Sequence, residues 1–162
     1  MSRSASKAAP PIGLGRVSRF SRGMSLIELL VAVTILGIVS SIAIPSYIQY
    51  MTRTKRTVGK TLLLQVADRQ EQFFADNKAY APDLTTLGYP ADNLAVDDKG
   101  APVPAASSDR LYMITLTNTT ASTFTANAAP QLVQASRDTE CLTLTLTHTG
   151  LRDTTGGGVN CW

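Results

Sequence analysis

Hydrophobic positions are concentrated near the start of the chain, in residues 24–44. This run reads MSLIELLVAVTILGIVSSIAI, and among its 21 residues only Glu28 carries an ionisable side chain. A helix of that length extends about 31 Å, close to the hydrocarbon thickness of a bilayer. The pattern therefore predicts a membrane-spanning helix that contains one carboxylate.

After residue 44 the chain shows first a helical pattern, then a loop, and then strand patterns. Apolar residues recur at helical spacing from Val58 to Phe73, which predicts an amphipathic helix ending near residue 78. A Pro- and Gly-rich stretch at 80–110 predicts a long loop. Alternation of apolar and polar residues predicts three strands, at 111–117, 122–128 and 142–147. The expected fold class is α+β, with a long N-terminal helix packed on a three- or four-stranded antiparallel sheet.

Charge separates the first 23 residues from the remainder. Residues 1–23 hold five Lys or Arg and no acid, whereas residues 24–162 carry a net charge of −2. The basic excess thus belongs to a segment that resembles the basic region of a signal sequence, not to a nucleic-acid site. A second basic cluster, Arg53-Thr54-Lys55-Arg56 with Lys60, is interpreted as a solvated helix face, with lipid headgroups or DNA as alternative partners.

Candidate chemistry is sparse. The chain has two cysteines, Cys141 and Cys161, and one histidine, His148, which is too few ligands for a structural zinc site. In an exported chain a disulfide is the expected use, and two separate buried thiols are the alternative. The same pair favours an oxidising compartment for the body. We find no combination of nucleophile, base and orienting group, so we expect no catalytic residue, metal or cofactor.

Glu28 allows three interpretations. The run could be an ordinary signal peptide cleaved after Ser41-Ile42-Ala43, although a carboxylate is unusual there. It could be a simple anchor with Glu28 near the interface. Thirdly, Glu28 could be functional, which is the default for an intramembrane carboxylate. If the chain is cut between Gly23 and Met24, the new N-terminal amine is a partner, and an adjacent subunit's Glu28 could reach it.

The junction itself carries a family resemblance. Gly23-Met24-Ser25-Leu26-Ile27-Glu28-Leu29-Leu30 resembles the class III leader junction of type IV prepilins, with Met24 in place of the usual Phe and a long leader. This resemblance implies that a prepilin peptidase cuts after Gly23 and N-methylates Met24, and that Glu28 guides assembly. Gly37 and Pro45 stand where pilins commonly carry Gly and Pro, and a kink or local melting is expected near Pro45.

The C-terminal end extends this resemblance. Cys141-Leu142-Thr143-Leu144 and Cys161-Trp162 are similar to the end of PilE-type minor pilins. The implied organisation is a cleaved leader at 1–23, a hydrophobic helix at 24–52 that serves as anchor and assembly stalk, and a globular body at 53–162 with a disulfide-bounded C-terminal loop. The implied location is the inner membrane, single-pass with the body in the periplasm, and later the extracellular pilus.

The function expected from this resemblance is that of a minor type IV pilin. Its implied partners are the prepilin peptidase, major and minor pilins, the inner-membrane assembly machinery and, before assembly, the membrane. A major pilin, a type II secretion pseudopilin, a DNA-uptake pilin and a membrane-anchored enzyme are the alternatives. DNA is possible but not favoured, because the net charge of residues 24–162 opposes electrostatic capture.

Overall fold

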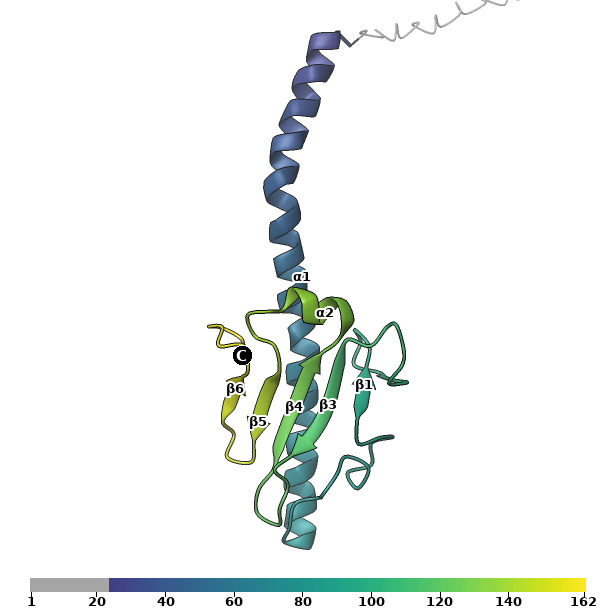
Figure 1. Ribbon diagram of the computed structural model, residues 1–162, viewed down its shortest axis with the longest axis vertical. Helices are drawn as coiled ribbons and strands as arrows, with labels where there is room; N and C mark the ends of the chain where they lie inside the picture. The colour runs from purple at the N-terminus through teal and green to yellow at the C-terminus, as the bar shows by residue number, and fades with distance from the viewer. Residues whose placement is uncertain (1–23) are drawn as a thin grey trace, which may run out of the picture. The chain divides into compact units, whose positions relative to one another are not determined.

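The computed structural model describes residues 24–162, so the leader, including Gly23, lies outside the described part. The longest element is helix α1 (Leu26–Asn77), drawn purple to teal in Figure 1. The chain divides within this helix into two compact units, with the boundary after Ser40. In the first unit the described residues, 24–40, are all exposed, and they are helical from Leu26 onward. By length and composition, α1 is the one described helix that could cross a membrane.

Helix α1 includes both Gly37 and Pro45. The helix continues through Pro45, and a bend at these two residues stays a prediction. Hydroxyl groups in its apolar part bond within the helix: Thr34 donates to the carbonyl of Leu30 at 2.8 Å and Ser46 to that of Ile42 at 3.0 Å. Hydroxyls paired in this way carry a lower cost in an apolar environment.

The second unit contains an antiparallel sheet with strand order β2-β1-β3-β4-β5-β6. A short helix, α2 (Leu132–Arg137), follows β4. The strands are β1 (Leu94–Val96), β2 (Pro102–Val103), β3 (Tyr112–Thr117), β4 (Thr125–Pro130), β5 (Leu144–Thr147) and β6 (Arg152–Thr154).

The predicted α+β class is confirmed, and the sheet is larger than expected. The three central strands β3, β4 and β5 correspond to the three predicted strands. The additional strands β1, β2 and β6 have only two or three residues each. Such short segments contain too few positions for a period of two to be recognised, and β1 and β2 fall inside the stretch predicted as loop.

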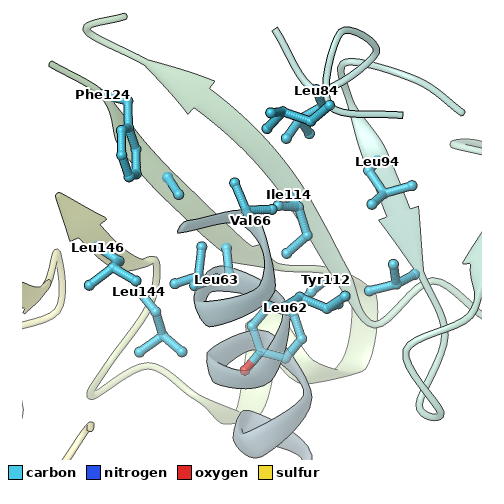
Figure 2. Packing of buried hydrophobic residues seen from close by; sticks show 14 of the residues in the cluster. Leu62, Leu63, Val66, Leu84, Leu94, Tyr112, Ile114, Phe124, Leu144 and Leu146 are labelled. Atoms are coloured by element: carbon cyan, nitrogen blue, oxygen red, sulfur yellow. The ribbon is translucent and has the colours of Figure 1, made fainter. Parts of the chain in front are cut away.

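The core lies between the body's part of α1 and one face of the sheet, as Figure 2 shows. Leu62, Leu63 and Val66 of the helix meet apolar residues from all three central strands. Gly59 permits the closest approach, because a Cβ there would lie 3.2 Å from the ring of Tyr112. The strands contribute Tyr112, Ile114, Ala126, Ala128, Leu144 and Leu146 to this core.

A disulfide joins Cys141 to Cys161, as expected. The loop it bounds folds back on the residues before β5: Gly158 N–H donates to the carbonyl of Glu140 at 2.8 Å and Gly156 N–H to that of Cys141 at 3.2 Å. The chain end also covers the sheet edge, because the indole N–H of Trp162 donates to the carbonyl of Asp153 in β6. The C-terminal segment is therefore part of the body rather than a free tail.

We expect replacement of both cysteines, Cys141→Ser with Cys161→Ser, to lower the free energy of unfolding by about 3 kcal/mol. The bridge spans a sequence separation of 20 residues, and its loss enlarges the ensemble of the unfolded chain. Urea denaturation of the body measures this difference. An unchanged midpoint under oxidising conditions would contradict it, and Thr139→Ser, an exposed neighbour, is the control.

Candidate functional site

Two of the predicted processing and assembly residues are described: Met24 lies just before α1 and Glu28 lies within it. Met24 is 66% exposed, and Glu28 is exposed in the first turn of the helix. A carboxylate in a first turn interacts favourably with the helix macrodipole. Within the described residues, no hydrogen bond or ion pair of the Glu28 side chain is present, so the described chain leaves this carboxylate available to a partner.

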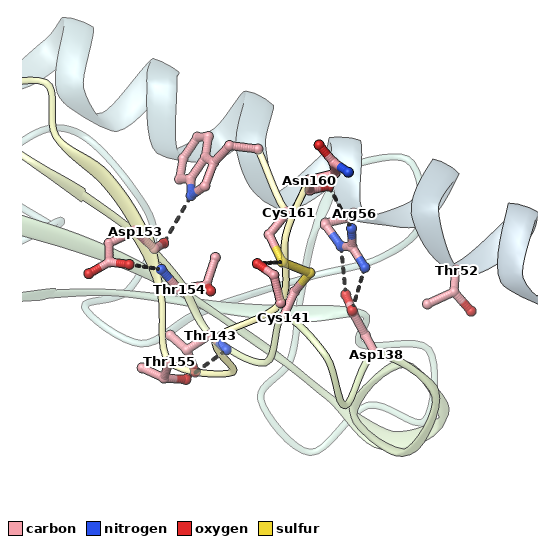
Figure 3. The surroundings of a disulfide bond; sticks show 12 residues. Thr52, Arg56, Asp138, Cys141, Thr143, Asp153, Thr154, Thr155, Asn160 and Cys161 are labelled. Carbon is pink, nitrogen blue, oxygen red and sulfur yellow. Dashed lines mark hydrogen bonds and ion pairs between the residues drawn. A yellow bond between two sulfur atoms is a disulfide. The ribbon is translucent and has the colours of Figure 1, made fainter.

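A buried polar network connects the body's helices, and it centres on an ion pair (Figure 3). Arg56 of α1 donates from Nε to Oδ2 of Asp138 at 3.0 Å and from Nη2 to Oδ1 at 2.6 Å. The two side chains are 7% and 1% exposed. The hydrogen bond to Asp138 raises the pKa of Arg56, and desolvation opposes it. Bidentate geometry of this kind is the strong form of an arginine–carboxylate pair.

Gln134 of α2 extends the network to the sheet. Its Nε2 lies 3.1 Å from the carbonyl of Thr52, 3.3 Å from the hydroxyl of Tyr112 and 3.3 Å from Oδ2 of Asp138. Arg56 also donates to the carbonyl of Asn160 at 3.4 Å. Helix α2 and the disulfide-bounded loop are thereby fixed to α1 at the level of Thr52 and Arg56.

This network corrects one expectation from the sequence. Arg56 was expected on a solvated face with Arg53, Lys55 and Lys60, yet it is only 6% exposed. The other three side chains are exposed or half-buried. The partner of Arg56 is 82 residues away along the chain, and α2 has no sequence signature. No local pattern could therefore have revealed the pair.

A groove with a volume of about 370 Å³ lies on the side of α2 that faces the β1–β2 turn. The charged side chains along it are mixed: the cations are Lys55, Lys99, Arg110 and Arg137, and the acids are Asp97, Asp98 and Asp109. Arg110 is held by a hydrogen bond to the carbonyl of Ser107 at 2.8 Å. Within residues 24–162, no cluster of His, Cys, Asp and Glu could hold a metal ion.

The long N-terminal helix begins with an apolar part, and its later part packs on an antiparallel sheet with a disulfide near the C-terminus, which is the α+β architecture expected for a type IV pilin. Sequence comparison gives the family. Residues 45–145 match the family described as type IV minor pilin ComP, DNA uptake sequence receptor. Residues 18–44 match the prokaryotic N-terminal methylation motif. The first match covers more than half of the chain, and the chain therefore belongs to this family of type IV pilins.

Two curated relatives are consistent with that assignment. The type IV major pilin protein PilA of Myxococcus xanthus (strain DK1622) is 39% identical over 77 residues, 46% of this chain and 35% of the relative. The type IV major fimbrial protein FimA of Dichelobacter nodosus is 33% identical over 79 residues, 49% of this chain and 48% of the relative. The chain thus matches half or less of the length of these two relatives.

Tyr112 gives the network a measurable pH dependence. Burial raises its pKa from 10.0 to about 12, so the folded state keeps the proton over a range where the unfolded chain loses it. The stability from this group is fully present below pH 10 and is lost as the pH rises to 12. We expect the body to lose about 2–3 kcal/mol over this range relative to Tyr112→Phe. Urea titrations of both proteins measure the difference, and parallel stability curves would contradict it.

Proposed function

We propose that the chain is a minor type IV pilin whose leader, residues 1–23, is removed by a prepilin peptidase that also N-methylates Met24. The observation that carries this proposal is the methylation motif matched over residues 18–44, which includes the exposed apolar start of α1 and its one carboxylate, Glu28. Residues 24–52 would then hold the body, residues 53–162, on the periplasmic side of the inner membrane. The assembly machinery would move the subunit from there into the extracellular pilus.

Glu28 has a specific role in this proposal. Among apolar helices in a filament core, an unpaired carboxylate costs several kcal/mol, and the methylated amine of an adjacent subunit would remove that cost. The pair would also define the axial offset between neighbouring subunits, because one offset satisfies every charge. Gly37 and Pro45 would help these helices to pack.

The assignment as a minor rather than a major pilin rests on the body. The family profile that covers residues 45–145 is described as that of a minor pilin. The two relatives named as major pilins match over less than half of this chain. Type IV pilins are structural subunits, and we propose no catalytic role and no cofactor for this one.

DNA contact is a second candidate function. The matched family is described as a DNA uptake sequence receptor, and every residue that lines the groove beside α2 falls within the matched range. Lys55 and Lys99 could contact phosphate groups there. Three carboxylates share the groove, so its surplus of positive charge is small and electrostatic attraction to phosphate groups would be weak.

We expect Glu28→Gln to leave the chain in the membrane and to reduce its incorporation into fibres by more than about tenfold, because the neutral amide cannot pair with the amine. Immunoblots of membranes and sheared fibres, from cells that lack the unaltered chain, measure this ratio. Asp76→Asn, an exposed change at the far end of α1, is the matched control. Equal incorporation of both variants would refute the pairing of Glu28.

For the second candidate, we expect Lys55→Glu with Lys99→Glu to weaken binding of the full chain in nanodiscs to duplex DNA. The slope of log affinity against log salt should fall by about 1 for each lost phosphate contact. Fluorescence anisotropy at several salt concentrations measures both quantities. Lys78→Glu with Arg152→Glu changes the net charge equally away from the groove. Equal weakening by the two pairs would mean non-specific attraction and no groove site.

A further inference from the structure

One surface of the body is both apolar and basic, and we call it the α2 face: Arg53 of α1 with Leu132, Val133 and Arg137 of α2. Leu132 and Val133 are 43% and 58% exposed, and both arginines are exposed. In Figure 1, α2 lies beside α1 at one end of the sheet, opposite the β3–β4 turn. No hydrogen bond or ion pair of either arginine side chain exists within residues 24–162.

The polar network of Arg56, Asp138 and Gln134 fixes the position of the α2 face along the axis of α1. Gln134 bonds to the carbonyl of Thr52, so α2 lies level with Thr52. The continuous run of exposed apolar side chains on α1 ends just before it: Tyr47 and Tyr50 are each 65% exposed and Ile48 is 37% exposed, and beyond this run Leu64 is the exposed large apolar residue of the helix. With Glu28 at one interface, the 20 residues from Leu29 to Ile48 extend about 30 Å across the hydrocarbon, and the four residues from Ile48 to Thr52 extend about 6 Å further. That distance falls within the headgroup layer of a bilayer, which is about 5–8 Å thick on each side.

The tyrosines and arginines in this part of the chain are residue types that favour a membrane–water interface. Tyrosines gather where hydrocarbon meets headgroups, and arginines there reach anionic groups with their charged ends. Arg53 and Arg137 line a second cavity of about 270 Å³ together with Arg56, Asp138 and Glu140. Because Arg56 and Asp138 neutralise each other, two free arginines remain against one exposed carboxylate, that of Glu140.

Leu132 has a backbone conformation that leucine rarely adopts. Its φ is +48°, a left-handed value that Gly or Asn adopts more easily than a bulky residue. The leucine side chain is nevertheless exposed rather than buried in the core. The left-handed backbone at Leu132 therefore presents an aliphatic group at the surface of the α2 face.

We propose that, before assembly, the α2 face docks on anionic lipid headgroups of the membrane that holds the chain's own apolar helix. Arg53 and Arg137 bind the lipid phosphates, and Leu132 and Val133 enter the boundary between headgroups and acyl chains. Aliphatic side chains at the centre of the face fit lipid better than DNA, which would meet the cations alone. This inference rests on the membrane anchor in the proposed function, and it adds a second, reversible membrane contact by the body.

The test uses the ¹⁵N-labelled full chain, inserted through its own helix into nanodiscs that carry a trace of lipid with a nitroxide headgroup. We expect strong paramagnetic broadening of the amides of residues 133–137 when the lipid is phosphatidylglycerol. Arg53→Glu with Arg137→Glu should reduce this broadening by about twofold or more, because attraction to an anionic surface scales with the basic residues near it. Lys78→Glu with Arg152→Glu, remote from α2, should leave it unchanged.

A second variant tests the apolar part of the α2 face without destabilising the body. Leu132→Asn suits the left-handed backbone, so the body should fold at least as well, yet the broadening at α2 should fall. Equal broadening in phosphatidylglycerol and phosphatidylcholine, or the same loss with the control pair, would overturn the proposal. It would also be overturned if Arg53→Glu with Arg137→Glu abolished DNA binding and left the broadening intact. Failure of the chain to insert into nanodiscs would instead refute the anchor.

Discussion

The body of this pilin depends on one buried ion pair, Arg56 with Asp138. The pair joins α1 to the segment between α2 and Cys141, and Arg56 also reaches the loop that ends at the disulfide. Removal of one partner from such a pair costs about 3–5 kcal/mol, because the other charge stays buried without compensation. A hydrophobic pair of similar size could give equal stability. The ion pair adds geometric specificity, because its two parallel hydrogen bonds allow only one placement of α2 and the C-terminal loop relative to Arg56.

Helix α1 meets two environments along its length. Up to Tyr50 its apolar side chains are exposed, and from Thr52 onward it buries one stripe against the sheet. The change occurs within about one turn, at the level of α2 and the ion pair. The polar network therefore lies where the run of exposed apolar side chains ends and the packed body begins.

The sequence predicted the elements that have long patterns, and those predictions were confirmed. The alternation of Leu and Thr in β5 and the helical stripe at Leu62 and Val66 are local signals, repeated often enough to be recognised. The Arg56–Asp138 pair, α2 and the short strands were missed, because long-range partners, strands of two or three residues and a helix of less than two turns leave no recognisable period. The processing and assembly residues, Gly23, Met24 and Glu28, were recognised by motif, and their roles remain proposals.

The two proposed uses of the α2 region compete within one molecule. Arg137 lines both the groove of the DNA candidate and the cavity beside Arg53, so headgroups bound at the α2 face would occupy a cation that the groove shares. A subunit held in the membrane would thus present a weaker anionic-ligand site than one released from it. In these proposals, assembly into a filament would move the body away from lipid and release these arginines from the headgroups. If both proposals hold, DNA contact is suppressed in the membrane pool by the same surface that later supports it, without any change in the fold.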